Sequence, residues 1–203
     1  MRISVATRNA GKLREMEALF AGSGFTLATY DGYAEPVEGE TSYCENAALK
    51  ARTLHRQLRA AELPADVLAD DSGLEVRALG DRPGVLTAYY GGPGLSWPER
   101  RRRLVAELDD CDPADRRARF VCAVHYVGDG GRELATLATV EGEIARADRG
   151  AAGFSFDPIF LYPPAGLTFA EMDETAKNRV SHRAIAVAGL LATLRAAGIT
   201  PST

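Results

Sequence analysis

The stretch Ile3-Ser4-Val5-Ala6-Thr7-Arg8-Asn9-Ala10-Gly11-Lys12 decides how the chain begins to fold. Its first part, residues 3–6, is mostly apolar and predicts a short buried strand. A polar loop with a glycine follows, and beyond it apolar residues recur at helical spacing, at Leu13, Met16, Leu19 and Phe20. The run Gly22-Ser23-Gly24 predicts the end of this helix. The chain therefore opens with a strand, a loop and a helix.

Strands and helices intermix along the rest of the chain. Ser42, with Glu45 three residues later, has the spacing of a capping box and predicts the start of the second helix. Gly128-Asp129-Gly130-Gly131 between two apolar runs predicts a hairpin. We expect strands at 25–29, 67–69, 120–127 and 134–144, helices at 43–60, 97–108 and 181–197, an acidic loop at 31–40, turns at 80–94, and a loop around a short strand at 150–164. This order predicts an α/β or mixed α+β fold.

Length and composition limit what kind of protein this is. With 203 residues, 46% hydrophobic and 26% charged, the chain is expected to form one globular domain, 1–203, without a separable linker. The formal net charge of −4 argues against affinity for polymeric nucleic acid or membranes, because binding many phosphates favours a basic surface. It leaves room for one small anionic ligand held by a few cations.

The cysteines and the apolar runs indicate a cytoplasmic protein. Cys44, Cys111 and Cys122 are odd in number and lack C-x-x-C spacing, so neither a disulfide framework nor a zinc site is expected. The apolar stretch near Met1 is too short for a signal peptide. The longest small or apolar run, residues 184–192, is well short of the roughly 18 residues of a membrane span.

The first loop, residues 7–12, has two interpretations. Backbone N–H groups at a helix start are unpaired and favour an anion, and Thr7, Asn9 and Lys12 could add side-chain donors and a positive charge. A Walker A loop is absent. In the alternative, the segment is a plain strand–helix turn in which Asn9 caps the helix. The residues alone do not separate a phosphate cradle from a capped turn.

Two adjacent carboxylates, Asp70 and Asp71, follow the strand predicted at 67–69. Neighbouring side chains of an extended chain point to opposite sides, so only one of the two would face a given site. Glu38, from the acidic loop, is a second source of oxygen ligands, and Mg²⁺ takes one or two carboxylates together with water and substrate phosphates. Asp-Asp-Ser-Gly is also rich in turn-forming residues, and on this evidence a turn is the favoured interpretation.

A basic cluster near the C-terminal end consists of Lys177, His182 and Arg183. If Ser181 caps the last helix, His182 and Arg183 lie in its first turn, where the helix dipole disfavours a cation. That mismatch suggests a polar or anionic ligand, although a solvated arginine and a structural histidine are the simpler alternative. The other arginine-rich stretches, residues 100–103 and 116–119, are interpreted as solvated helix or surface positions rather than a nucleic-acid site.

The motifs of this chain, taken in order, resemble the inosine/xanthosine triphosphate pyrophosphatase (Ham1-type) family from residue 3 to about residue 194. The matching segments are Ala6-Thr7-Arg8-Asn9-Ala10-Gly11-Lys12; Glu38, Glu45-Asn46-Ala47 and Lys50-Ala51; Ala69-Asp70-Asp71-Ser72-Gly73-Leu74; Pro83-Gly84-Val85; Ala118-Arg119-Phe120; Gly153-Phe154 with Asp157-Pro158-Ile159-Phe160; and Lys177 with Ser181-His182-Arg183. A single one of these motifs is weakly specific, whereas the ordered set is strongly so.

The resemblance implies a fold and an activity. It implies an elongated mixed sheet flanked by helices, in two lobes with an active-site cleft between them, and a homodimer. It also implies Mg²⁺-dependent hydrolysis of ITP, dITP and XTP to the nucleoside monophosphate and pyrophosphate, which removes these nucleotides from the pool. The alternatives are a related Maf-like pyrophosphatase with another base preference, and a nucleotide-binding module without turnover.

The resemblance also implies roles for individual residues. Asp71 would accept the proton of the attacking water, with Asp70 in support, and Glu38 and Asp71 would bind Mg²⁺. Phe154 would stack on the purine, and His182 or Arg183 would donate to the base. The implied substrate-binding residues are Thr7, Arg8, Asn9, Ala10, Gly11, Lys12, Ser72, Phe154, Ser155, Phe156, Asp157, Lys177, His182 and Arg183.

The chain departs from the family pattern at two places. Ser155 and Phe156 stand where Gly and Tyr or Trp are usual, and Ser155 lacks the backbone freedom of glycine. Thr87-Ala88-Tyr89-Tyr90 lacks a usual arginine, whose contact would be absent or replaced from residues 100–103. These changes concern base selectivity more than catalysis.

Overall fold

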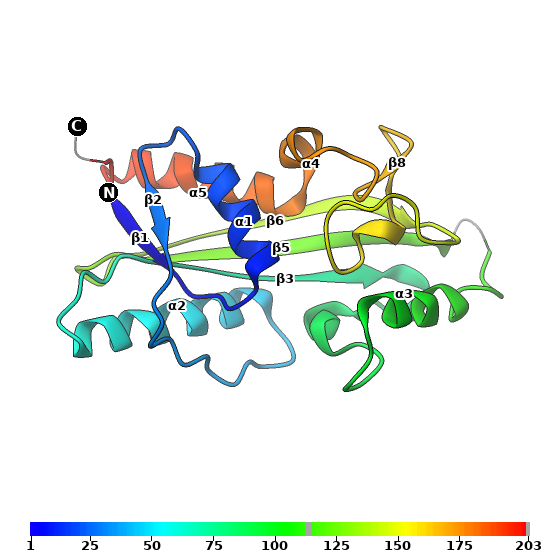
Figure 1. The fold of residues 1–203 in the computed structure, drawn as a ribbon, viewed down its shortest axis with the longest axis horizontal. Helices are drawn as coiled ribbons and strands as arrows, with labels where there is room; N and C mark the ends of the chain where they lie inside the picture. The colour runs from blue at the N-terminus through cyan, green and yellow to red at the C-terminus, as the bar shows by residue number, and fades with distance from the viewer. Residues whose placement is uncertain (113–114, 202–203) are drawn as a thin grey trace. The chain divides into compact units, whose positions relative to one another are not determined.

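The computed structural model describes residues 1–112 and 115–201 (Figure 1). Its α-helices are α1 (Ala10–Phe20), α2 (Tyr43–Ala60), α3 (Trp97–Ala106), α4 (Glu174–Val180) and α5 (His182–Ala196), and its 3₁₀ helices are η1 (Arg77–Leu79), η2 (Gly84–Tyr89) and η4 (Asp157–Ile159). The strands are β1 (Arg2–Val5), β2 (Thr26–Ala28), β3 (Val67–Val76), β4 (Arg82–Pro83), β5 (Arg117–Val127), β6 (Glu133–Ile144), β7 (Phe160–Tyr162) and β8 (Leu167–Thr168).

The described strands form one mixed sheet in the order β2-β1-β3-β5-β6-β7-β8, with β4 paired to β3. The strand β1 is parallel to both β2 and β3, whereas β7 is antiparallel to β6 and β8. A sheet with both kinds of pairing, flanked by helices, confirms the predicted mixed α/β class.

The chain divides into two compact units. Unit 1 consists of Met1–Asp71, Cys122–Ala138 and the chain from Arg183 onward, and unit 2 consists of Ser72–Val121 and Thr139–His182. Each unit has its own hydrophobic core.

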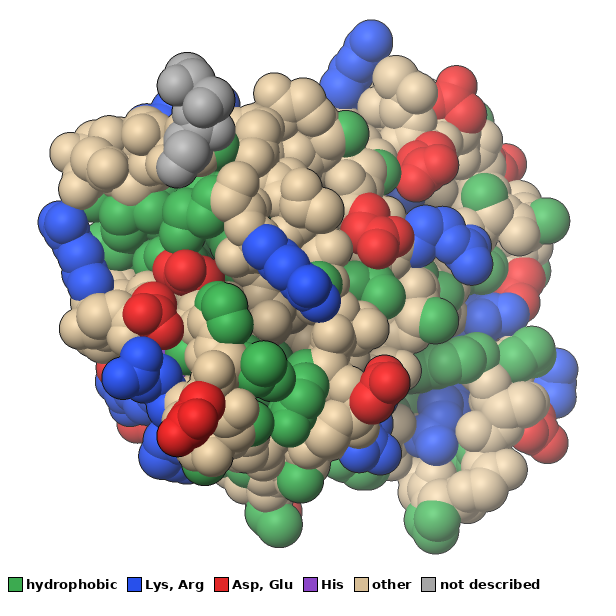
Figure 2. Space-filling model, turned by 60° about the vertical axis from the view of Figure 1, so that its left-hand side comes forward, with side chains coloured by type: hydrophobic (Ala, Val, Ile, Leu, Met, Phe, Trp, Pro, Cys, Tyr) green, Lys and Arg blue, Asp and Glu red, His purple; other side chains and the backbone are tan. Residues whose placement is uncertain are grey.

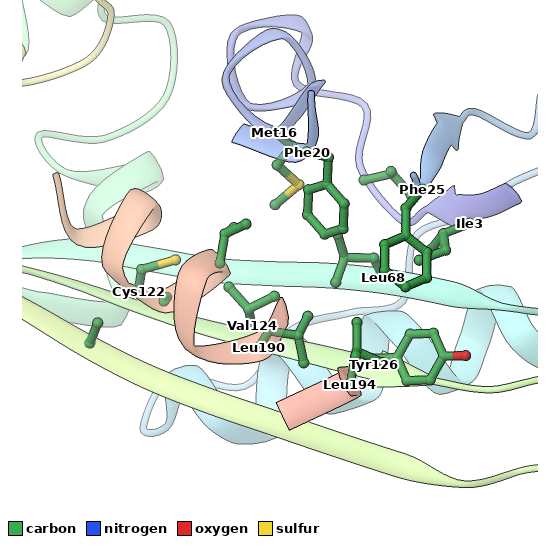
Figure 3. Close-up of a cluster of buried hydrophobic side chains, with 14 residues drawn as sticks. Ile3, Met16, Phe20, Phe25, Leu68, Cys122, Val124, Tyr126, Leu190 and Leu194 are labelled. Carbon is green, nitrogen blue, oxygen red and sulfur yellow. The ribbon is translucent and has the colours of Figure 1, made fainter. Parts of the chain in front are cut away.

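In unit 1, helices cover both faces of the strands, with α1 and α5 on one face and α2 on the other (Figure 1). Figure 3 shows the first of these cores, in which α1 and α5 pack on the strands. The helices contribute Met16, Phe20, Leu190 and Leu194, and the strands contribute Ile3, Leu68, Val124 and Tyr126. On the opposite face, α2 packs Ala51, Leu54 and Leu58 against Val67 and Ala69. Successive residues of β3 therefore alternate between the two cores, which assigns Asp70 to the α1–α5 face and Asp71 to the α2 face.

In unit 2, an aromatic core joins the strands to α3 and to the segment around η4. Phe120 of β5 lies within 4.5 Å of the Phe160 ring, and Phe156 packs edge-on against Trp97 of α3. Both Phe156 and Phe160 are fully buried. This core anchors the segment that contains the aromatic motif at residues 153–160.

Most of the predicted elements are confirmed. The second helix runs over the residues expected, and the Ser42 side chain caps it by accepting from the Glu45 N–H. The first helix, the strand near residues 25–29, the hairpin of β5 and β6 and the last helix also occur where the pattern places them. The predictions did not include α4 and the two-residue strands β4 and β8.

The favoured interpretation of Asp-Asp-Ser-Gly as a turn is wrong, because these residues lie inside the ten-residue strand β3. Aspartate favours turns because its side chain can form hydrogen bonds with the nearby backbone. Here the carboxylates of Asp70 and Asp71 bind cations from neighbouring helices instead. The strand can therefore continue through both residues.

The interpretation of the arginine stretches as solvated is wrong for three of them. Arg100, Arg101 and Arg116 are buried, and their guanidinium groups bind backbone carbonyls and, for Arg101, the Asp148 carboxylate. A planar group with five donors can be buried where several acceptors converge. Helical spacing alone could not show those acceptors. Exposure is as expected for the remaining arginines, Arg102, Arg103, Arg117 and Arg119.

On the face drawn in Figure 2, basic and acidic side chains are interspersed, and neither sign forms a continuous patch. Cys44 is exposed and Cys122 buried, and both are free thiols, as is Cys111. Over the described part of the chain, every helix is too short or too polar to cross a membrane.

Candidate active site

Asp70 lies in a buried charge network on the α1–α5 face of unit 1. Its Oδ2 atom is 3.0 Å from Lys12 Nζ and 3.1 Å from Arg183 Nη2. Arg183 also pairs with Glu15 of α1. Burial alone would raise the pKa of Asp70, but Lys12 and Arg183 hold it well below the usual range. Asp70 is therefore a fixed negative charge. Among the described residues its Oδ1 atom, which is also buried, has no hydrogen-bond partner.

Asp71 lies on the α2 face and binds two side chains of that helix. Lys50 Nζ is 3.0 Å from Asp71 Oδ1, and Asn46 Nδ2 donates to Asp71 Oδ2 over 3.1 Å. Lys50 Nζ is also 3.1 Å from Glu38 Oε2, so one ammonium group joins two carboxylates. Burial raises the pKa of Asp71 above its usual value, and Lys50 opposes that rise. The two neighbouring aspartates are thus shifted in opposite directions.

Asn46 also holds the loop that presents Glu38. Its Oδ1 atom accepts from the Gly39 N–H at 2.8 Å, and its Nδ2 donates to the Gly39 carbonyl at 2.9 Å. The acidic loop is therefore tied to α2 directly beside Glu38. This arrangement brings Glu38 and Asp71 to the same cation although 33 residues separate them along the chain.

The first loop caps its helix. The Asn9 side chain accepts from the N–H groups of Gly11 and Lys12, and Thr7 Oγ1 accepts from the Asn9 N–H. The predicted helix cap at Asn9 is confirmed, and these three N–H groups have partners in the structure. A cavity of about 310 Å³ is bordered by residues 7–10. The Lys12 ammonium pairs with Asp70 and is not part of the cavity lining.

The aromatic motif of unit 2 is built around Asp157. Its Oδ2 atom accepts from the Phe154 N–H and from Lys177 Nζ, each over 2.7 Å. Lys177 Nζ in turn lies 5.2 Å from the centre of the Phe154 ring. Sequence-predicted residues of this motif, Phe154, Asp157 and Lys177, are therefore in mutual contact.

Two predicted substrate residues are fully buried. Phe156 is 0% exposed and packs against Tyr90 and Trp97, and Arg183 is 1% exposed and binds Glu15 and Asp70. The cation of Arg183 at the start of α5 is thus balanced by carboxylates, so the dipole mismatch requires no ligand. Phe156 lacks a hydroxyl and sits among aromatic rings, as a core residue does.

The remaining predicted residues occupy defined positions. His182 begins α5 and stacks on the Phe120 ring at 4.5 Å with an interplanar angle of 12°. Ser72 is half-buried on β3, and Ser155 has a positive φ of 57°. That φ is the left-handed conformation that glycine adopts without strain, as expected from the family pattern.

Sequence reasoning missed three charged or polar residues of the site, Asn46, Lys50 and Glu15. Asn46 and Lys50 belong to the family-like segments but have no role in the sequence-based prediction, although a spacing of four puts both on one face of a helix. Glu15 follows Lys12 by three residues, which is the same kind of signal. Their partners on β3 and α5 could not be read from α1 and α2 alone.

A mixed α/β fold that carries a buried pair of carboxylates within strand β3, each paired with a lysine, has the charges that a site for a cation and an anionic ligand requires. The chain belongs to the Ham1 family, whose model matches residues 3–193. The resemblance indicated by the motifs is confirmed.

Individual relatives are similar to this chain over almost its whole length. A dITP/XTP pyrophosphatase of Methylococcus capsulatus is 42% identical over 199 residues, which cover 96% of each chain. A dITP/XTP pyrophosphatase of Thermus thermophilus is 43% identical over 193 residues, covering 94% of this chain and 90% of the relative. The solved structure of a HAM1 protein from Coxiella burnetii has a TM-score of 0.81 and 36% identity, covering 97% of this chain and 99% of that one.

Proposed function

We propose that this chain hydrolyses the non-standard purine nucleoside triphosphates ITP, dITP and XTP to the monophosphate and pyrophosphate. The observation that carries the proposal is the convergence of Glu38 and Asp71 on Lys50, with the pKa of Asp71 raised by burial. A protein that only binds its ligand has little use for a buried carboxylate placed where it can accept a proton. Family membership and the activity after which the relatives are named support the same reaction.

The residues of unit 1 suit a divalent metal ion. Glu38 and Asp71 each place a carboxylate oxygen about 3 Å from the same ammonium nitrogen, so hard oxygen donors already surround a cation. No cluster of three or more potential metal ligands occurs in the described residues. Two carboxylates suit Mg²⁺, which completes its shell with water and substrate phosphates. We assign Glu38 and Asp71 to Mg²⁺, which when bound neutralises phosphate charge and acidifies water.

Asp71 is the general base in this proposal. It would take the proton of the water that attacks the phosphate, while Asn46 and Lys50 fix the orientation of its two oxygens. Asp70 is less suited, because the low pKa caused by Lys12 and Arg183 makes it a poor proton acceptor. We assign Asp70 the role of holding Lys12 in place.

The first loop would bind the phosphates. Lys12 supplies the charge, and Asn9 can donate through its amide nitrogen while its oxygen caps the helix. The positive end of the α1 dipole adds to the attraction. The implied loop residues are Thr7, Arg8, Asn9, Ala10, Gly11 and Lys12, and Ser72 is assigned a further contact with the substrate.

The aromatic motif would bind the base. Phe154 would stack on the purine beside Lys177, Asp157 and Ser155, and His182 would donate to the oxygen at position 6 of inosine or xanthosine. Adenosine carries an amino group there, and a site built on a hydrogen-bond donor rejects it, by roughly 10⁴. We assign Phe156 to the support of this site, because it is fully buried against Tyr90 and Trp97. We assign Arg183 to the charge network of Asp70 in unit 1.

The family resemblance also supports a proposal about compartment and assembly. We infer a cytoplasmic homodimer. Leu86 and Tyr89 are exposed apolar side chains on η2 that a partner subunit could cover. Sedimentation of the purified chain at micromolar concentration tests the dimer, and a single monomer species would contradict it.

Pyrophosphate release tests the activity. We expect release from ITP, dITP and XTP that depends on Mg²⁺, and much slower release from ATP, GTP, CTP and UTP. GTP carries the same oxygen at position 6, so in this proposal it is excluded at its 2-amino group. Equal rates with ATP and ITP would contradict the base preference. Rapid release from modified pyrimidine nucleotides would favour a Maf-like activity. Nucleotide binding without release from any substrate would leave only a binding module.

A further inference from the structure

The segment 153–157 of unit 2 has a strained backbone. Ser155 has a φ of 57° and Gly153 a φ of 71°. A Cβ atom at Gly153 would lie 2.3 Å from Asp157 Oδ2, so the segment turns back sharply on itself. A non-glycine residue in the left-handed region is retained only where its surroundings hold it there. Something must therefore fix the backbone at Ser155.

One side of the segment is held by Asp157, as described above. The other side is held by α3, from which Arg101 donates through Nη1 to the Ser155 carbonyl over 2.8 Å. Trp97, one helical turn earlier on the same face of α3, packs edge-on against Phe156 with ring centres 5.5 Å apart. Arg101 and Trp97 of α3 therefore contact Ser155 and Phe156, the two residues that follow Phe154.

Arg101 is itself anchored. Its Nε lies 2.9 Å from both Asp148 carboxylate oxygens, and its Nη2 lies 2.7 Å from Asp148 Oδ2. This is a two-pronged pair, which fixes the plane of the guanidinium group and hence the direction of Nη1. The Arg101 side chain is 10% exposed and that of Asp148 is 43% exposed. The guanidinium group of Arg101 therefore donates to the Asp148 carboxylate and to the Ser155 carbonyl.

We propose that Arg101, oriented by Asp148, is a positioning residue that sets the backbone at Ser155 and thereby the placement of the Phe154 ring for nucleobase binding. The inference rests on the proposed function, in which Phe154 stacks on the purine. Arg101 acts through the backbone of the segment, so its loss weakens binding of the base and leaves the phosphate chemistry of unit 1 in place.

Steady-state kinetics with ITP and Mg²⁺ tests this. In Arg101→Ala, KM rises about tenfold with kcat within about twofold, because one charge-assisted hydrogen bond to the segment is lost. Arg101→Lys keeps the charge but loses the planar set of guanidinium donors, so its KM lies between those of wild type and Arg101→Ala. Arg102→Ala is the matched control, since it removes an exposed positive charge from the next position of α3, and it retains wild-type kinetics. Equal KM values for Arg101→Ala and Arg102→Ala would overturn the proposal.

A double-mutant cycle separates positioning from general destabilisation. If Arg101 acts through Phe154, then Arg101→Ala has almost no further effect on KM when Phe154 is already alanine. Independent, multiplicative effects would overturn the proposal. Asp148→Ala, at a half-exposed position, gives a milder test if Arg101→Ala does not fold, and it raises KM in the same direction.

Hydrogen exchange distinguishes a failure of this inference from a failure of the proposed function. Peptides covering residues 150–158 exchange faster in Arg101→Ala and Asp148→Ala than in wild type or Arg102→Ala. This result is expected whether or not ITP is the substrate. Unchanged exchange in that segment would overturn the positioning role. An inactive wild-type chain with altered exchange in the variants would overturn the proposed function alone.

Discussion

Asp70 and Asp71 are neighbours on β3, yet their carboxylates bind opposite layers of unit 1. Asp70 contacts Lys12 of α1 and Arg183 of α5, and Asp71 contacts Asn46 and Lys50 of α2. The pKa of Asp70 is lowered and that of Asp71 is raised. Folding therefore favours the ionised form of Asp70 and disfavours the ionised form of Asp71. One residue of the pair is thereby suited to structure and the other to proton transfer.

The two aspartates should differ in their contribution to stability. Asp70→Asn leaves the buried Arg183 without one of its two carboxylates and should lower the free energy of unfolding by about 3–5 kcal/mol. Asp71→Asn leaves the buried Lys50 ammonium paired with Glu38 and should cost less stability than Asp70→Asn, because burial already disfavours the Asp71 charge. Urea unfolding at pH 7 measures both. Equal losses would show that the two charges have the same role.

The stability contribution of Asp70 should depend on pH. Its pKa in the folded chain is below the unfolded value of roughly 3.9, so the ionised form stabilises the fold above that pH. The stability gap between wild type and Asp70→Asn should be constant from about pH 7 to pH 5. It should then narrow by about 1.4 kcal/mol per pH unit below about pH 4. A gap that widens in acid would contradict the pKa direction.

Lys50 should compete with a metal ion for the same oxygens. Lys50→Met leaves Glu38 and Asp71 close together without their shared cation. Their mutual repulsion should lower stability, and added Mg²⁺ should then stabilise the variant more than it stabilises wild type. Thermal unfolding with and without millimolar Mg²⁺ measures the difference. Arg56→Met, at an exposed site on the same helix, is the control, and an identical Mg²⁺ response in both variants would argue against a metal at these carboxylates.

Ser155 and Gly153 should respond in opposite ways to substitution. Ser155→Gly removes the strain of a side chain at φ 57° and should raise stability by about 0.5–1 kcal/mol. Gly153→Ala adds a Cβ atom at 2.3 Å from the Asp157 carboxylate and a strained φ, and should be strongly destabilising. Thermal unfolding of the two variants checks this. A stable Gly153→Ala protein would mean that the segment has another conformation.

Patterns within one element of the chain were read correctly from sequence. Helical spacing, the Ser42 cap and the glycine-rich hairpin turn depend on neighbours only a few residues away, so they predicted α1, α2, β5 and β6 well. The alternation rule also predicted that Asp70 and Asp71 point to opposite sides. These features are local, and local chemistry is what a sequence displays directly.

The errors came from partners distant in sequence. Asp-Asp-Ser-Gly was interpreted as a turn because the cations that stabilise the two aspartates inside β3 are distant in sequence. Lys50 is 21 residues from Asp71, and Arg183 is 113 residues from Asp70. Arg100 and Arg101 were assigned to a solvated face because their acceptors, the Tyr90 and Ser155 carbonyls, lie on other segments. Burial of a charge depends on where its counter-charge or acceptor arrives in the fold, and composition does not contain that information.

The most direct test of the account is the rate of Mg²⁺-dependent pyrophosphate release from ITP by Asp71→Asn, measured beside wild type. We expect the variant to fold, as judged by its urea unfolding curve, and to lose about 10²–10⁴ of kcat, the usual contribution of a general base. Wild-type turnover in a folded Asp71→Asn protein would contradict the assignment of Asp71 as the base that accepts the proton of water.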